Sequence, residues 1–578
     1  MSMAMEGFLY LAILILLAYP LGMYIGKIMN GEPVFLSKVV VPIENATYRL
    51  LNIDKEEQMT AKKYSISVIL FSLVSFLVLF LLHVLQGVLP LNPEHFSGTS
   101  WHLAFNNTAS FVTNTNWQSY SGESTLSYFT QMLGLTVQNF ASAAVGISVL
   151  FALIRGFIKV KETGLGSFWV DTTRGILFVL LPLSLVVSIA LVSQGVIQNF
   201  SSYQTVALVQ PVTLQDGTVI TQEVVPQGPA ASQIAIKQLG TNGGGFFGTN
   251  SAHPLENPTP LSNLIEMISI LLIPTALCFT FGRNVKDKRQ GVAIFLAMFL
   301  LLFGALAVII TTESSAPPQL AQNGAVNVSD VGQAGGNMEG KETRLGIAAS
   351  GTWTAFTTAA SNGSVNSMLD SYTPLGGMIP MLLMQLGEVV FGGAGCGLYG
   401  MIGFAILAVF IAGLMVGRTP EYLGKKIEPY EMRMAVLVCL ATPVHILIGS
   451  GIATALPQTV QNLGNRGAHG FSEILYAYSS AGGNNGSAFA GFNANTVFGN
   501  LTIGLIMLVA RFVPMLATLA IAGSLVQKKK VAVSAGTLPT HDAMFVGLLI
   551  FVVLLIGALS FFPALALGPI AEYFQMLG

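Results

Sequence analysis

The stretch QLGTNGGGFFGTN, residues 238–250, has three consecutive glycines between two Thr-Asn pairs, in a chain that is otherwise half apolar. Residues 243–248 match the G-x-G-x-x-G pattern of loops that bind phosphate groups. A nucleotide site also needs a lysine directly after the glycines, or a preceding strand and an acidic residue about 20 positions later. Here two phenylalanines follow the glycines, residues 250–260 contain three prolines, and Glu266 lies within an apolar segment. The stretch therefore does not indicate a nucleotide site.

The same glycines allow a second chemistry, in which backbone carbonyl groups are the ligands. Glycine frees φ and ψ, so successive carbonyl oxygens can point at one axis. Rings of such oxygens replace the hydration shell of a permeating cation, and a short helix that ends there adds its negative C-terminal end. This chemistry favours a monovalent cation, because a divalent-selective filter is expected to carry rings of Asp or Glu. For a single copy, the alternative is an ordinary Gly- and Asn-rich external turn.

The composition places the chain in a lipid bilayer. Of 578 residues, 52% are hydrophobic and 9% are charged, whereas soluble domains carry about 25% charged residues. The net charge of −1 does not suggest nucleic acid as a partner. Three cysteines and seven histidines are scattered, without the spacing of a disulfide framework or a transition-metal site. We expect an integral membrane protein without a transition metal.

Ten segments are apolar and long enough to cross a bilayer, which takes about 20 residues per helix. They predict an all-α polytopic membrane protein with spans near residues 7–27, 65–89, 128–156, 174–198, 260–282, 289–311, 374–416, 432–455, 497–524 and 541–568. The seventh segment is about twice the usual length. It is interrupted by GGAGCG, residues 392–397.

Basic residues report the orientation of these spans. They follow the odd-numbered spans, in clusters within residues 38–63, 155–174, 283–289, 418–433 and 528–530. By the positive-inside rule these loops are cytoplasmic. Both termini, and the loops after even-numbered spans, are then predicted to lie outside.

The outside loops after spans two, four, six and eight each contain a short amphipathic stretch that leads into a polar tract. The four stretches are residues 103–119, 231–247, 347–364 and 471–487. Their equivalent points, Thr115, Asn242, Asn362 and Asn485, are separated by 127, 120 and 123 residues, which indicates an internal repeat. We predict four repeats around a central pore, each a helix, a re-entrant half-helix with its polar tract, and a second helix. The predicted units are residues 60–160, 170–285, 286–420 and 430–527, flanked by helices within 1–30 and 540–578.

Several long motifs carry a resemblance to a known family, among them FVTNTNWQSYSGE, LGTNGGGFF, SAHPLENPT, GEVVFGG, GRTPEYLGKKI and NNGSAFAG. From about residue 7 to the C-terminus the chain resembles the KdpA family, the potassium-transporting A subunits of bacterial Kdp complexes. The resemblance implies a channel-like fold of the K⁺ transporter superfamily, with K⁺ as the substrate ion. It also implies a P-type ATPase partner, KdpB, the small subunits KdpC and KdpF, and a place in the bacterial inner membrane. Arg418, within GRTPEYLGKKI, would face the partner.

The resemblance further implies which residues form the K⁺ selectivity filter. Four three-residue tracts match it, numbered by repeat: Asn114, Thr115, Asn116 (tract 1); Thr241, Asn242, Gly243 (tract 2); Ser361, Asn362, Gly363 (tract 3); Asn484, Asn485, Gly486 (tract 4). Gln118 resembles a position linked to K⁺ affinity. Tract 1 ends in Asn116 where the others end in glycine, so the filter is not expected to be strictly four-fold.

Two further features bear on how ions pass the membrane. Gly392, Gly393 and Gly395 break span seven near mid-membrane. The resemblance favours a gating loop below the filter, and a simple kink or two short spans is the alternative. Glu388 and Arg511 are charges within apolar segments, where each costs at least about 2.5 kcal/mol. We expect Arg511 to be an electrostatic barrier below the filter and Glu388 to belong to the exit route, the alternative being a buried structural ion pair.

The energy source decides between two classes of function. The chain has neither a P-loop lysine nor the Asp-Lys-Thr-Gly-Thr motif of P-type pumps, so we expect it to bind no nucleotide and to hydrolyse no ATP by itself. It is then either the ion-binding subunit of an ATP-driven high-affinity K⁺ importer or a stand-alone Trk/Ktr-like channel or symporter. GRTPEYLGKKI and the flanking first and tenth spans favour the pump subunit. A noncatalytic membrane scaffold would leave the four tracts unexplained.

Overall fold

A computed structural model describes residues 3–214, 216–315, 335–387, 389–415, 417, 419–532 and 537–577. Within these residues, ten helical segments are long and apolar enough to cross a membrane, which confirms the predicted number and the predicted fold class. Their helices are α1 (Met3–Met29), α3 (Ala61–Leu85), α5 (Val137–Ile158), α6 with α7 (Phe168–Arg174, Leu181–Ser193), α9 (Pro260–Asn284), α10 (Lys288–Glu313), α14 (Cys396–Met415), α15 (Pro429–Ala455), α18 (Val497–Leu525) and α19 with α20 (Ala543–Leu565, Ala571–Leu577).

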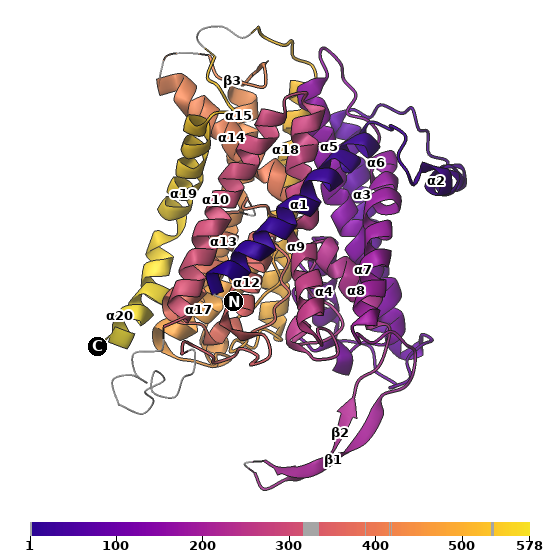
Figure 1. The fold of residues 1–578 in the computed structure, drawn as a ribbon, viewed down its shortest axis with the longest axis vertical. Helices are drawn as coiled ribbons and strands as arrows, with labels where there is room; N and C mark the ends of the chain where they lie inside the picture. Colours follow the sequence, from indigo (N-terminus) through magenta and orange to yellow (C-terminus); the bar gives the residue numbers. More distant parts are fainter. Residues whose placement is uncertain are drawn as a thin grey trace.

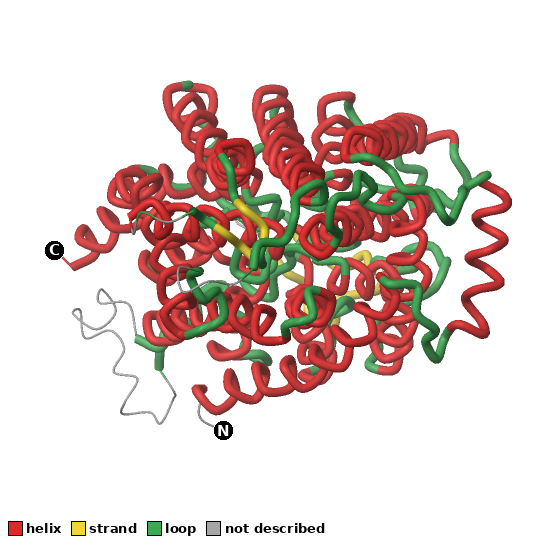
Figure 2. Tube along the Cα trace, turned by 90° about the horizontal axis from the view of Figure 1, so that it is seen from above, coloured by secondary structure: helices red, strands yellow, loops and turns green. Residues whose placement is uncertain are grey.

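The long helices form one bundle, with both chain ends at the same end of it (Figure 1). The helix α2 (Ser37–Leu51) and the two-residue strand β3 (Glu421–Tyr422), which pairs with β4 (Lys425–Lys426), lie at the opposite end. Both follow odd-numbered spans, so these two basic loops meet at one end, as the charge pattern predicts. Seen from above, many helices appear end-on around loops at the centre (Figure 2).

Four short helices fill the half of the bundle nearest the chain termini (Figure 1). They are α4 (Trp101–Val112), α8 (Ala230–Leu239), α12 (Gly346–Ala359) and α17 (Gly467–Gly482), and each occupies the predicted amphipathic stretch. Each packs against a helix before it and a helix after it in the chain: α3 and α5, α7 and α9, α10 and α13 (Pro374–Gln385), α15 and α18. Each short helix is thus held between the two helices that flank it in the chain, with its C-terminal end inside the bundle.

The predicted seventh span is two helices. The first, α13 (Pro374–Gln385), is followed by α14 only after residues 386–395. The chain leaves the helix because Gly387, Phe391 and Gly392 have φ values of 84°, 65° and 62°, a left-handed conformation that an α-helix cannot contain. The break therefore begins several residues before the GGAGCG run that predicted it.

A hairpin between α7 and α8 was not predicted. Its strands, β1 (Gln204–Thr213) and β2 (Val219–Val225), are antiparallel and project beyond the bundle at the end that holds the termini (Figure 1). Both strands are exposed on most of their residues. Valine and threonine favour the extended conformation, but a hairpin without a buried face has no alternation of polar and apolar residues to reveal it.

Small residues allow α1 to lie directly on α9. A methyl group built on Gly22 would overlap the carbonyl oxygen of Ala276, and one built on Gly26 would come within 2.8 Å of Arg283. The hydroxyl of Thr280 donates to the carbonyl oxygen of Gly22 at 2.8 Å. Close backbone approach through small residues is a principal source of helix association in membranes.

We predict that Gly22→Ala destabilises the protein by about 1–3 kcal/mol, the usual cost of overpacking. Gly304 on α10 is the matched control, because no atom lies within 4 Å of a methyl group built there. Thermal unfolding of both variants in detergent measures the difference. Equal melting temperatures for Gly22→Ala and Gly304→Ala would contradict the close packing of α1 and α9.

Candidate functional site

The four tracts share one backbone conformation. The first residue of each is left-handed, with φ of 64° (Asn114), 55° (Thr241), 50° (Ser361) and 46° (Asn484). The third is left-handed as well, with φ of 55° (Asn116), 82° (Gly243), 97° (Gly363) and 110° (Gly486). The middle residues are not left-handed. A left-handed residue other than glycine is uncommon, so its presence at the first position of all four tracts indicates a conformation that the surrounding structure imposes.

This alternation separates the two kinds of backbone polar group. When left-handed residues alternate with residues that are not left-handed, neighbouring peptide groups face the same way. The N–H groups then gather on one side of the segment and the carbonyl groups on the other. In every tract the middle N–H donates back to the carbonyl oxygen five residues earlier: Thr115 to Ser110 (2.9 Å), Asn242 to Lys237 (2.8 Å), Asn362 to Thr357 (2.9 Å), Asn485 to Ser480 (2.8 Å). These N–H groups are used within the parent half-helix, which lets carbonyl oxygens face away from it.

Each tract contacts the next tract along the chain, and tract 4 contacts tract 1. A methyl group built on the last glycine of tracts 2, 3 and 4 would overlap a carbonyl oxygen of the next tract: Asn362 from Gly243, Asn485 from Gly363, Thr115 from Gly486. Between tracts 1 and 2, the side-chain amide of Asn114 donates to the carbonyl oxygen of Thr241 at 2.8 Å. The four tracts therefore form a closed ring, in which eleven of the twelve residues are buried and Gly486 is partly exposed.

Asparagine amides join the quarters of this ring. Asn242 donates to the side-chain oxygen of Asn114 at 2.6 Å, and Asn484 donates to the hydroxyl of Thr115 at 2.9 Å. Asn116, the residue that breaks the four-fold pattern, donates to Asn139 on α5 at 2.9 Å and to the carbonyl oxygen of Gly244 at 3.0 Å. Its side chain ties tract 1 to its neighbours, which a glycine could not do.

A cavity of about 460 Å³ opens on one side of the ring. Its lining includes Asn116, Gly244, Gly363 and Gly486, one residue from each repeat. Gln118 also lines it and makes a reciprocal pair with Gly245: the amide nitrogen of Gln118 donates to the Gly245 carbonyl at 3.0 Å, and the Gly245 N–H donates back at 2.8 Å. Gln118 thus supports the backbone just beyond tract 2.

The break in span seven lies on another side of the ring and touches it. The N–H of Ala394 donates to the hydroxyl of Thr241 at 2.9 Å, and the N–H of Gly392 donates to the carbonyl oxygen of Ala359 at the end of α12. A methyl group on Gly393 would come within 2.6 Å of the Cys396 sulfur. A methyl group on Gly395 would overlap the carbonyl oxygen of Gly146 on α5. The predicted glycines therefore let the segment between α13 and α14 fit between tract 2 and α5.

Arg511 lies on α18 and is buried, with 4% of its surface exposed. One guanidinium nitrogen lies 3.5 Å from a methyl group built on Gly146, at the same place where residues 394 and 395 touch α5. Arg511 and Asn484 of tract 4 line one small cavity of about 20 Å³. The arginine is thus next to both the ring and the break. Glu388 and Arg418, also predicted from the sequence, lie outside the described residues.

The comparison with family models decides which family this chain belongs to. The model of the potassium-transporting ATPase A subunit family, KdpA, matches residues 8–574. The chain belongs to this family. Curated relatives cover its whole length: one from Clostridium botulinum (strain Alaska E43 / Type E3) is 75% identical over 578 residues, which are 100% of both chains. One from Clostridium perfringens (strain ATCC 13124) is 72% identical over 98% of both chains. One from Desulfovibrio desulfuricans is 62% identical over 98% of both.

These three relatives of the KdpA family carry the name potassium-transporting ATPase potassium-binding subunit. Among solved structures, the potassium transporter TrkH from Vibrio parahaemolyticus is similar, with a TM-score of 0.50 and 13% identity, over 87% of this chain and 96% of that one. At this identity the likeness concerns the fold alone. It agrees with the channel-like fold that the sequence resemblance implies.

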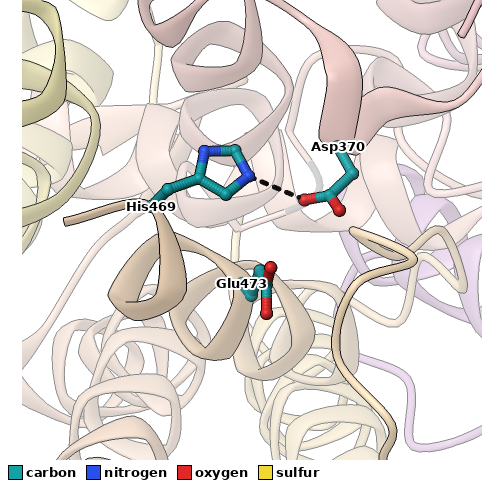
Figure 3. A group of neighbouring side chains, drawn as sticks. All are labelled: Asp370, His469 and Glu473. Carbon is teal, nitrogen blue, oxygen red and sulfur yellow. Dashed lines mark hydrogen bonds and ion pairs between the residues drawn. The ribbon is translucent and has the colours of Figure 1, made fainter. Parts of the chain in front are cut away.

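The sequence analysis missed a histidine–carboxylate cluster, which Figure 3 draws. The ring nitrogens of His469 contact Asp370 at 3.0 Å and Glu572 at 2.8 Å, and Glu473 lies one turn further along α17. Partial burial lowers the pKa of His469, but the hydrogen bonds to Asp370 and Glu572 outweigh it and raise the pKa to about 10. These contacts join α17, α20 and the turn at Leu369–Ser371.

The sequence analysis also missed the four residues whose carbonyl groups anchor the tracts. Ser110, Lys237, Thr357 and Ser480 each precede the middle residue of their tract by five positions. That constant offset was available in the sequence. What it could not reveal is the left-handed turn that brings the middle N–H back onto the half-helix.

Proposed function

We propose that this chain binds and translocates K⁺ as the channel-like subunit of an ATP-driven, high-affinity K⁺ import complex. One observation carries the proposal: four tracts of one backbone conformation close into a buried ring in chain order. The names of the KdpA-family relatives support K⁺ as the ion. The twelve residues of the ring include no aspartate or glutamate, which fits a monovalent cation held by neutral oxygens.

In this proposal the tracts are a selectivity filter. K⁺ enters the cavity beside Gln118 from outside and exchanges its water for carbonyl oxygens of the ring. The C-terminal ends of α4, α8, α12 and α17 meet at the tracts, and their partial negative charge favours a cation. The repeats are then residues 60–160, 170–285, 286–420 and 430–527, with flanking helices within 1–30 and 540–578.

We propose that the energy comes from a partner. The relatives are named as subunits of an ATPase, which supports a P-type ATPase subunit of the KdpB kind, with KdpC and KdpF, as the complex in which this chain works. The chain itself would bind K⁺ and no nucleotide. The basic loops at one end support a bacterial inner-membrane orientation with both termini outside. Arg418 is proposed to face the partner.

Purifying the chain with and without its co-purifying subunits tests this function. We expect the complex to hydrolyse ATP only when K⁺ is present, and the isolated chain in liposomes to show no ATP-independent K⁺ flux. K⁺ flux through the isolated chain would contradict the pump subunit and support the stand-alone Trk/Ktr-like channel or symporter instead.

Gly243→Ala tests the filter. Its methyl group would overlap the Asn362 carbonyl, and overpacking of about 1–3 kcal/mol corresponds to about 5- to 150-fold in K⁺ affinity. Gly217→Ala is the matched control, because Gly217 also has a positive φ, 86°, but has open space around it. The measurement is the K⁺ concentration that half-maximally stimulates ATP hydrolysis by the complex. An unchanged concentration in correctly inserted Gly243→Ala would exclude tract 2 from the filter.

The break between α13 and α14 is proposed as a gate, with Arg511 as the cationic barrier beside it and Glu388 on the exit route. The contact of Ala394 with Thr241 supports this, because it couples the break to tract 2. A guanidinium next to the ring repels a second cation until the break moves.

Arg511→Gln should therefore weaken the coupling between ions and ATP hydrolysis. We expect either ATP hydrolysis in the absence of K⁺ or K⁺ transport that is no longer proportional to ATP hydrolysis. Both rates are measured together in proteoliposomes. Arg466→Gln, at an exposed arginine, is the control. Wild-type transport and wild-type coupling in Arg511→Gln would contradict the proposed gate with Arg511 as its barrier.

A further inference from the structure

One quarter of the ring has a different kind of anchor residue from the other three. At the position five residues before the centre of each tract, repeats 1, 3 and 4 have Ser110, Thr357 and Ser480, whereas repeat 2 has Lys237. In repeats 3 and 4 the hydroxyl of this residue accepts the N–H of the last glycine, Gly363 or Gly486, at 2.9 Å. A lysine side chain cannot accept a hydrogen bond. Repeat 2 therefore holds its tract by other means.

The backbone of Lys237 replaces the missing hydroxyl and does more. Its carbonyl oxygen accepts the N–H groups of Asn242 at 2.8 Å and Gly243 at 3.1 Å, both in tract 2. It also accepts the side-chain amide of Asn362, in tract 3, at 3.1 Å. One carbonyl group thus sets the position of two neighbouring tracts, and a shift of Lys237 would move both.

The side chain of Lys237 fixes that carbonyl group in place. Its ammonium forms an ion pair with Glu256, and both side chains have no exposed surface. Along the way its stem passes 3.4 Å from a methyl group built on Gly245, just beyond tract 2. A buried ion pair is strongly destabilising to break on one side only, because the remaining charge is left without a partner. The end of α8 is therefore clamped to the loop that precedes α9.

The clamp continues to tract 3 through a second route. The hydroxyl of Ser251 lies 2.7 Å from Glu256 and 2.8 Å from Glu266. Glu266 accepts the amide of Gln238 at 3.0 Å, and the oxygen of that amide accepts the hydroxyl of Ser364, next to tract 3, at 3.0 Å. The ion pair and tract 3 thus belong to one buried hydrogen-bonded network behind the ring.

We propose that Lys237 is a positioning residue for ion selection: its ion pair with Glu256 holds tracts 2 and 3 at the spacing that distinguishes K⁺ from other monovalent cations. The inference rests on the proposed function of the ring as a K⁺ filter and deepens it. Lys237 touches no ion in this account and acts through the carbonyl groups of Asn242 and Asn362. It also makes the filter unequal, because one quarter has a charged anchor residue, whereas the tracts of repeats 3 and 4 are held by hydroxyl groups.

The test uses the assembled complex and the variant Lys237→Met/Glu256→Gln, which removes both charges at similar volume. The readouts are the K⁺ and Rb⁺ concentrations for half-maximal stimulation of ATP hydrolysis, together with thermal stability. We expect the complex to assemble, and the ratio of the Rb⁺ to the K⁺ concentration to fall by about 5-fold or more. An assembled double variant with the wild-type ratio would overturn the proposal.

Glu256→Gln is the second variant and does not depend on the double variant folding. It leaves the Lys237 ammonium without a counter-charge behind tract 2, which repels cations, so we expect a K⁺ concentration about 5-fold higher or more. An unchanged K⁺ concentration would overturn the proposal. The control is Arg155→Gln/Asp171→Asn, which removes a largely buried ion pair of 2.6 Å near the C-terminal end of α5.

We expect this control to lose stability but to keep the wild-type Rb⁺ to K⁺ ratio. A shift in the control as large as that in the Lys237 variants would make the effect a general consequence of losing a buried pair, and would overturn the proposal. The wild-type complex distinguishes a failure of the proposed function from a failure of the proposed role of Lys237. Hydrolysis that ignores K⁺ in the wild type would contradict the proposed function, whereas a K⁺-dependent wild type with unchanged variants would contradict only the role of Lys237.

Discussion

Backbone polar groups inside a membrane must be satisfied by protein or must line a path for water and ions, and this constraint explains the ring. The tracts are irregular backbone at the centre of a helical bundle. Their middle N–H groups return to the parent half-helices through the offset of five residues. That return is possible because the first residue of each tract is left-handed. The carbonyl oxygens of the tracts are the ligands that the site offers, and the long helices hold them in position.

The same constraint explains why small and amide residues dominate around the ring. Glycines 243, 363 and 486 let neighbouring tracts touch where a methyl group would overlap a carbonyl oxygen. Asparagines bridge the tracts because an amide both donates and accepts. The buried pair of Lys237 and Glu256 serves the same end with charge, which is costly in an interior unless both partners remain.

Much of this architecture could be predicted, because its signals are periodic. Ten apolar segments predicted ten membrane helices, and the spacing of four polar stretches predicted four short helices that now lie where expected. The missed features lack a periodic signal. The hairpin at 204–225 has no buried face, and the predicted break of span seven starts earlier than the GGAGCG run because Gly387 is left-handed. The contacts of Lys237 with Glu256 and of His469 with Asp370 join residues that only the fold brings together.

The central claim is that the ring itself holds the ion. A structure of the complex in Tl⁺, an electron-rich substitute for K⁺, tests it most directly through anomalous scattering. The account predicts a Tl⁺ peak on the axis of the ring, surrounded by carbonyl oxygens of all four tracts and lost when K⁺ is added in excess. A peak confined to the outer cavity, or beside Asp370 and Glu473, with none within the ring would contradict it.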